Sequence, residues 1–225
     1  MRNKSKVLVL MLSAAALVAA SVFGTMAYLT DNDQVTNTFT IGKVTLGDGN
    51  LEKGLDEAKV DEYGTLIPDV PRVQENTYKL IPGHTYIKDP TVHIGEDSES
   101  CWVFVKIVNG LVEGTVNIEA ATENTEGGYK TVADQITANE WKPLKNGNEP
   151  VPNVYYKQWT KPTGTVNDDY YDLLVFEEFK INGDGVDNTI LGAFENAQIV
   201  VTAYAVQLDG FENNAYGAWT AAEFN

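Results

Sequence analysis

In most apolar stretches of this chain, hydrophobic residues recur at every second position, which is the period of a β-strand. Near the C-terminus, Ile199, Val201, Ala203 and Ala205 share one face of such a stretch. Residues 102–108 are instead apolar on both faces, as in a strand that is covered from both sides. The strand-like stretches cover residues 35–46, 73–81, 85–94, 102–108, 154–159, 173–181 and 198–208. Separated by clusters of Gly, Pro and Asn, they predict an antiparallel all-β sandwich.

Helical periodicity is confined to short stretches between these strands. They cover residues 132–141, 190–196 and 213–224. We expect the last of them to form a C-terminal helix that caps the sheet. Residues 47–72 and 142–153 are rich in Gly, Pro, Asn and acidic residues, and we expect both to be surface excursions. Neither is long enough to indicate a second domain.

The first 27 residues have the pattern of a secretory signal peptide. Three basic residues precede an apolar run that extends to residue 20, and the small residues around Ala27 supply a cleavage point for a signal peptidase. A membrane anchor is the competing interpretation, but a spanning helix needs about 20 apolar residues and this stretch is borderline. Its Ala-rich, Gly-broken end favours cleavage after Ala27. We expect an N-terminal signal helix over residues 1–27 and one exported domain over residues 28–225.

The acidic composition narrows the range of partners. The formal net charge is −16 over 225 residues, and it becomes −19 without the leader, which carries three basic and no acidic residues. This charge argues against nucleic acid and anionic lipid as partners, because binding to either needs a positive protein surface. An acidic surface can attract divalent cations, so calcium stays open, although no cofactor is required.

The single cysteine, Cys101, cannot form an intramolecular disulfide. It begins a strongly β-prone run, and unpaired cysteines are among the most buried residue types. We therefore expect Cys101 to act as a small buried hydrophobic residue. The alternative is a nucleophile paired with His84 or His93. No other catalytic arrangement is apparent in the sequence.

Candidate metal ligands are few. His84 and His93 are weak candidates for zinc, because they lie nine positions apart, on opposite faces of a regular strand, and the His-Glu-x-x-His motif is missing. We expect both histidines at the surface or in an edge strand. Asp184 and Asp187 lie in a Gly-containing segment that offers oxygen ligands to calcium, but the complete calcium-loop pattern is missing. A simple β-turn is the competing interpretation of that segment.

Several segments resemble a known family. Gly-Thr-Met-Ala-Tyr-Leu-Thr-Asp at residues 24–31 and Asn-Thr-Phe-Thr-Ile-Gly-Lys-Val-Thr-Leu at residues 37–46 resemble the secreted TasA/camelysin family of Gram-positive bacteria, whose leaders are processed by the signal peptidase SipW. Further similar segments cover residues 81–84, 88–92, 101–107 and 203–211. The middle of the chain, roughly residues 110–170, carries no motif of that family.

The resemblance implies a jelly-roll-like sandwich whose copies assemble into extracellular biofilm-matrix fibres. In that family, the mature N-terminal segment is thought to leave its own subunit and complete the sheet of the next. Here that donor segment corresponds to residues 28–38, with Tyr28 and Leu29 as apolar anchors. The residues assigned to assembly are Tyr28, Leu29, Thr30, Asp31, Val35 and Phe39. Head-to-tail donation does not close on itself, so it produces filaments.

Two other classes of function remain open. One is a monomeric surface module that binds calcium or glycans. The other is a camelysin-like metalloprotease, with zinc held by His84, His93 and an acidic residue. Because the usual zinc-binding helix motif is missing, we favour structural assembly first, the binding module second and the protease third.

Overall fold

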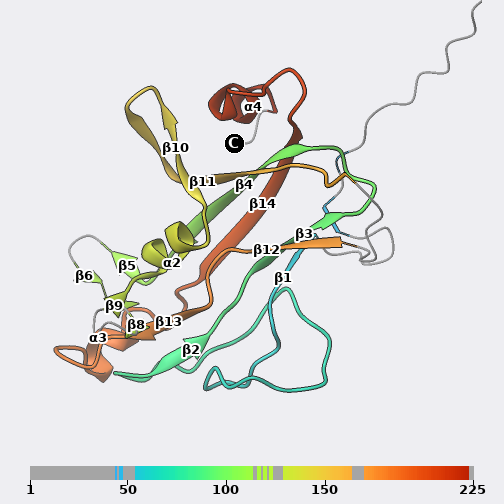
Figure 1. Ribbon diagram of the computed structural model, residues 1–225. Helices are drawn as coiled ribbons and strands as arrows, with labels where there is room; N and C mark the ends of the chain where they lie inside the picture. The colour runs from blue at the N-terminus through green and yellow to red at the C-terminus, as the bar shows by residue number, and fades with distance from the viewer. Residues whose placement is uncertain are drawn as a thin grey trace, which may run out of the picture. The chain divides into compact units, whose positions relative to one another are not determined.

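The computed structural model describes most of the chain after residue 43. It covers residues 44, 46–47, 54–113, 116–117, 119–120, 122–123, 129–163 and 170–222 (Figure 1). The predicted signal peptide, its cleavage point at Ala27 and the assembly residues between Tyr28 and Phe39 lie outside the described residues. Everything described belongs to the second of two compact units, residues 42–225. Within it, no helix is long and apolar enough to cross a membrane.

The described chain consists mostly of antiparallel strands with a few short helices, so the prediction of an all-β fold is confirmed. One sheet has four strands in the order β10-β11-β4-β14 (Figure 1). These are β10 (Lys142–Asn146), β11 (Glu149–Trp159), β4 (Cys101–Asn109) and β14 (Ile199–Gln207). β4 and β14 pair over their full lengths without a register shift.

The hairpin of β10 and β11 contradicts the expectation that residues 142–153 form a surface excursion. Gly147 adopts a positive φ of 62° in the turn, a conformation that glycine tolerates best. Pro143 in β10 and two further prolines in β11 conceal the strand character of this segment in the sequence. Proline is compatible with an edge position, because its missing N–H can face solvent there.

The second layer consists of two three-stranded groups. One is β1 (Leu55–Asp56), β3 (Thr91–Gly95) and β12 (Tyr170–Leu174), and the other is β2 (Thr85–Ile87), β13 (Glu178–Ile181) and β7 (Glu119–Ala120). Their registers are continuous, since Thr85 pairs with Lys180 and Thr91 with Leu174. The Val175 N–H also donates to the carbonyl of Pro90, at 2.9 Å. The two groups therefore form one sheet whose regular pairing is interrupted around Pro90, which has no N–H.

Smaller elements complete the fold. Two short hairpins pair β5 (Val112–Glu113) with β6 (Val116–Asn117) and β8 (Thr122–Glu123) with β9 (Tyr129–Lys130). The helices are α2 (Val132–Ala138), α3 (Asn188–Gly192) and α4 (Ala215–Ala221). All three lie at or beside the predicted helical stretches. A capping box of Thr131 and Asp134 begins α2, where both side chains satisfy free backbone N–H groups.

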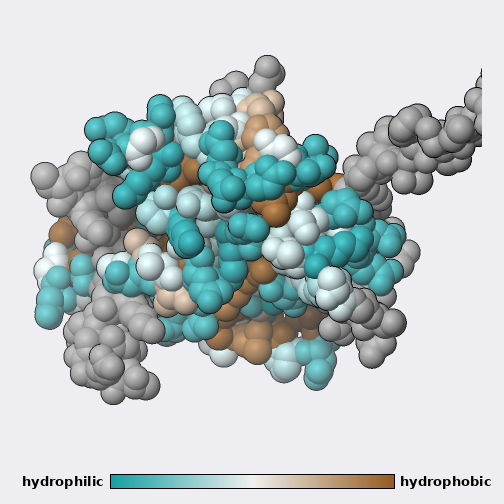
Figure 2. All heavy atoms as spheres, turned by 45° about the horizontal axis from the view of Figure 1, so that its top comes forward, coloured by the Kyte–Doolittle hydropathy of each residue, from teal (hydrophilic) through white to brown (hydrophobic). Residues whose placement is uncertain are grey.

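The main hydrophobic core joins the two layers through alternate residues of β4, including Cys101, Val103 and Val105. Cys101 is fully buried, which confirms the expectation for this residue. The other face of β4 presents Trp102 and Phe104 to a second cluster that α4 covers. β4 is thus buried on both faces and α4 caps the sheet, as the sequence predicts. Hydrophilic residues cover much of the face seen in Figure 2.

Candidate functional site

β14 forms an edge of the four-stranded sheet, and among the described residues only β4 pairs with it. The Gly110 N–H donates to the Gln198 carbonyl and the Leu208 N–H to the Ser100 carbonyl, both at 2.8 Å. In this continuous antiparallel register, the even-numbered residues of β14 therefore direct their backbone groups toward β4. The odd-numbered residues direct theirs toward the open edge: Ile199, Val201, Ala203, Ala205 and Gln207.

The two edges of this sheet differ in chemistry. β14 contains neither proline nor any charged residue along its nine positions. β10, at the opposite edge, carries Lys142, Pro143 and Lys145. Lysine and proline are the residues with which natural sheets prevent an edge from pairing with another chain. β14 is therefore the edge of this sheet that is suited to accept a further strand, and we call it the acceptor edge.

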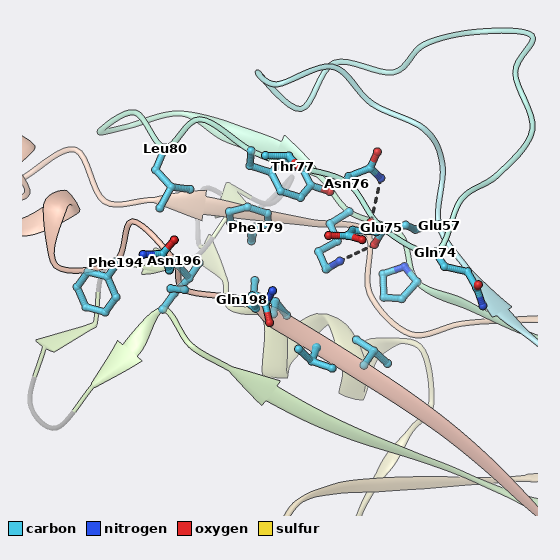
Figure 3. Close-up of a pocket in the computed structure, with 18 of the residues that line it drawn as sticks. Glu57, Gln74, Glu75, Asn76, Thr77, Leu80, Phe179, Phe194, Asn196 and Gln198 are labelled. Atoms are coloured by element: carbon cyan, nitrogen blue, oxygen red, sulfur yellow. Dashed lines mark hydrogen bonds and ion pairs between the residues drawn. The ribbon is translucent and has the colours of Figure 1, made fainter.

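A groove of about 630 Å³ lies beside the first half of the acceptor edge. Its apolar lining includes Leu55, Leu80, Phe179, Phe194 and Val201. Figure 3 shows Leu80 and Phe194 toward one end of the groove, and Glu57 and Gln74 toward the other. Apart from Asn196, which lies beside Phe194, the labelled side chains make the first end mainly apolar and the second mainly polar, and we call them the apolar end and the polar end. Its apolar end, beside an unpaired strand edge, can receive side chains of an added strand.

The wall opposite β14 is formed largely by residues 74–80. Residues 73–81 have the alternation of an extended segment, but they form no regular ladder in the structure, and their one β-bridge joins Val73 to Glu57. Hydrogen bonds from side chains hold this segment, where a strand would have a regular ladder of backbone hydrogen bonds. The Tyr86 hydroxyl donates to the Lys79 carbonyl at 2.6 Å and accepts from the Ile81 N–H at 2.7 Å. An extended segment without regular pairing thus faces the acceptor edge across the groove.

At the polar end of the groove, the Glu57 carboxylate contacts both Lys88 and Asn76. Lys88 Nζ lies 2.5 Å from Glu57 Oε2, and Asn76 Nδ2 donates to Glu57 Oε1 at 2.9 Å. We call these three residues the Glu57 cluster. The side chains of Glu57 and Lys88 are only 5% and 11% exposed. Sequence reasoning missed this cluster, because Glu57 lies in the segment that was expected to be a surface excursion.

A second polar network surrounds His93, which is 2% exposed. Its Nδ1 lies 2.6 Å from Asp172 Oδ1 and its Nε2 lies 2.9 Å from Asp56 Oδ1. Arg72 also binds Asp56 and reaches Asp89 at 2.9 Å. The expectation that His93 lies at the surface or in an edge strand is wrong. β3 is an inner strand, and carboxylates on both neighbouring strands satisfy the buried imidazole.

The structure does not bring the two histidines together at a metal site. His84 Nε2 lies 2.8 Å from the Tyr63 carbonyl, and the His84 ring packs edge-on against Tyr86. Both ring nitrogens of His93 already face carboxylates. Throughout the described residues, no three His, Cys, Asp or Glu side chains are grouped in a way that could hold a metal ion.

The two candidate calcium ligands, Asp184 and Asp187, lie at and just before the start of helix α3. Asp187 is the N-cap of α3, where its Oδ1 accepts from the N–H groups of Thr189 and Ile190, each at 2.9 Å. Asp184 is exposed in the bend before it. An aspartate N-cap satisfies backbone donors that a helix leaves unpaired. The structure therefore gives Asp187 a role in helix capping.

Burial raises the pKa of several side chains, among them Cys101 and Tyr78. Desolvation raises the pKa of the Cys101 thiol to about 12, so Cys101 is not a reactive thiolate at neutral pH. Desolvation also raises the pKa of Tyr78, and the charges of Glu57 and Asp89 raise it further. Tyr78 therefore remains a neutral phenol at neutral pH.

Comparison of the chain with protein-family models, curated proteins and solved structures gives no match.

Proposed function

We propose that the mature protein is a secreted structural subunit that assembles into extracellular fibres by donating residues 28–38 and Phe39 to the acceptor edge of a neighbouring copy. The observation that carries this proposal is the acceptor edge itself. β14 is nine residues long, apolar and uncharged, and lies beside a groove with an apolar end. The resemblance of the N-terminal sequence to the TasA/camelysin family supports the same function.

An added strand would make two kinds of contact with the acceptor edge and its groove: backbone hydrogen bonds and buried side chains. It would pair with the outward N–H and C=O groups of five β14 residues, each hydrogen bond contributing about 1 kcal/mol net. Val35 and Phe39 are four positions apart in the donor sequence, so they lie on one face of a strand. Burial of each in the groove would contribute about 1.5–3 kcal/mol. Ordering the donor costs about 1–2 kcal/mol per residue. The hydrogen bonds and the side-chain burial offset this cost only if most of these contacts form.

Donation explains why this subunit would form filaments rather than closed dimers. The donor precedes the domain in sequence, and the acceptor edge lies near the C-terminus. Each copy therefore offers one donor and one acceptor, which is a head-to-tail contact. The net charge of −19 keeps unassembled subunits apart at low salt, so added salt or calcium should promote assembly by screening.

The test compares two purified chains, residues 28–225 and residues 38–225, by negative-stain electron microscopy and size-exclusion chromatography. We expect filaments from the first and monomers from the second, with the same far-ultraviolet circular dichroism per residue in both. If the complete mature chain stays monomeric under all conditions tried, including added calcium and acidic pH, the proposal fails. Filaments from both chains would also contradict it, because they would not need the donor segment.

A further inference from the structure

The Glu57 cluster brings together a primary amine, an amide and a carboxylate from three separate parts of the chain. Glu57 follows β1, Lys88 follows β2, and Asn76 lies in the extended segment between them. One oxygen of the carboxylate contacts Lys88 Nζ at 2.5 Å and the other accepts from Asn76 Nδ2 at 2.9 Å (Figure 3). A single carboxylate therefore contacts both the amine and the amide.

Hydrogen bonds fix the Asn76 amide in one orientation. Its Nδ2 also donates to the Ala58 carbonyl at 2.8 Å, so both of its N–H groups are used. Its Oδ1 accepts from the Val60 N–H at 3.1 Å. This N–H polarises the side-chain carbonyl and would stabilise negative charge on Oδ1 if a nucleophile added to Cγ. These hydrogen-bond partners assign the orientation of the amide. The polarised carbonyl makes Cγ the electrophile.

The reacting groups lie in nearly buried surroundings. The side chains of Glu57 and Lys88 are nearly buried, and the aromatic ring of Tyr78 also lines this end of the groove. Before the attack, a proton passes from the Lys88 ammonium to the Glu57 carboxylate. The transfer can occur along the existing contact between Nζ and Oε2. It produces a neutral amine, the nucleophilic form of lysine.

We infer that Lys88 and Asn76 join in an intramolecular isopeptide bond, with Glu57 as the catalytic acid and base. Lys88 Nζ attacks Cγ of Asn76, and a new C–N bond forms as the C–Nδ2 bond breaks. Glu57 passes protons from the attacking nitrogen to the departing nitrogen, which leaves as an ammonium ion. Glu57 ends as a carboxylate. No oxidant or reductant takes part, and proximity supplies much of the rate.

The bond would tie residues 74–80 covalently to the end of β2. It would fix covalently a wall of the groove that side-chain contacts and a few backbone hydrogen bonds otherwise hold. The inference is independent of fibre assembly, because the reacting groups all belong to one chain and the bond forms within the folded monomer. It can therefore fail or succeed whether or not the proposed function is correct.

The test is intact-mass spectrometry of the purified mature chain, followed by tryptic mapping. We expect the mass to be lower than the sequence mass by one ammonia. Because trypsin does not cleave after an acylated lysine, residues 73–79 should appear joined to an uncut peptide of residues 80–106. A folded chain with the full sequence mass, cleaved normally after Lys88, would overturn the inference.

Controls separate this bond from other losses of ammonia. Asn109, Asn146 and Asn182 each precede a glycine, where an asparagine can lose ammonia by cyclising, so only the joined peptide identifies the cross-link. Lys88→Arg and Glu57→Gln should both show the full mass, whereas Lys145→Arg, a matched change in β10, should retain the loss. Glu57→Gln keeps the size of the side chain. If this variant still formed the bond, the role of Glu57 would be wrong.

Discussion

Proline substitutions at two adjacent positions of β14 separate assembly from folding. The N–H of Ala203 points toward the acceptor edge, whereas the N–H of Thr202 donates within the ladder with β4. Ala203→Pro therefore removes a donor that no described residue uses. Thr202→Pro removes a donor that the fold uses. The two variants introduce the same side chain one residue apart, so they form a matched pair.

The expected magnitudes follow from these positions. Proline is tolerated in an edge strand when its nitrogen faces outward, so Ala203→Pro should change the stability of the monomer by less than about 1 kcal/mol. Thr202→Pro should cost about 3 kcal/mol or more, because it removes a ladder bond and adds a steric clash. For a domain of this size, that loss lowers Tm by roughly 6–12 °C. In assembly, the outward proline ring of Ala203→Pro should oppose the donor strand by a similar energy, about 100-fold in affinity.

The assay combines thermal unfolding of chains that lack residues 28–37 with sedimentation of filaments from complete mature chains. Ala203→Pro should unfold close to the parent and leave nearly all protein in the supernatant. Thr202→Pro should unfold at a clearly lower temperature. Normal filament yield from a stable Ala203→Pro variant would refute the reasoning, because a proline ring at the central donor should weaken strand addition about 100-fold.

The remaining predictions concern stability. Trp219→Ala should lower the free energy of unfolding in urea by about 3–5 kcal/mol, because Trp219 packs against Phe104 at a ring distance of 5.3 Å and closes the second cluster. Arg72→Met should cost about 2–3 kcal/mol in the same assay, since it leaves the buried Asp56 without its guanidinium partner. Cys101 should react with a thiol reagent at pH 8 only in denaturant. Its pKa is raised to about 12 in the fold against about 8.5 when unfolded, so it contributes stability below pH 8.5 that is lost as pH rises toward 12, and Cys101→Ala should flatten this part of the pH dependence.

The elements that could be predicted from the sequence are those in which one local pattern agrees with the tertiary contacts. β4 is apolar on both faces and is covered on both faces. β14 has apolar residues at every second position, and its odd-numbered side chains pack against the main core. Helix α4 could be predicted for the same reason, because the helical spacing of its apolar residues places Trp219 over Phe104.

The elements that were missed depend on contacts between distant residues. β10 and the first residues of β11, 149–153, carry prolines and charges that are typical of a loop, and the pairing of β10 with β11 makes them strands. Residues 73–81 alternate as a strand does, but side chains rather than a partner strand satisfy them. The burial of His93 depends on Asp56 and Asp172, which lie 37 and 79 positions away. A local pattern contains no information about such partners.

The acceptor edge could be predicted only in part. The sequence indicates β14 as a strand, but its place at the end of the strand order appears only in the structure. The Glu57 cluster likewise joins residues 31 and 19 positions apart, none of which stands out alone. In both cases the strand topology brings together groups that no local sequence pattern identifies.

Hydrogen–deuterium exchange at single β14 amides tests the central claim most directly. Assembled filaments and chains lacking residues 28–37 would be exchanged in parallel, dissolved under quenching conditions and read by nuclear magnetic resonance. The even-numbered amides, bound to β4, should be protected in both samples and serve as the internal reference. We predict that the amides of Val201, Ala203 and Ala205 exchange freely in the truncated monomer and are protected in filaments. Free exchange of these three amides in filaments would contradict strand donation to β14.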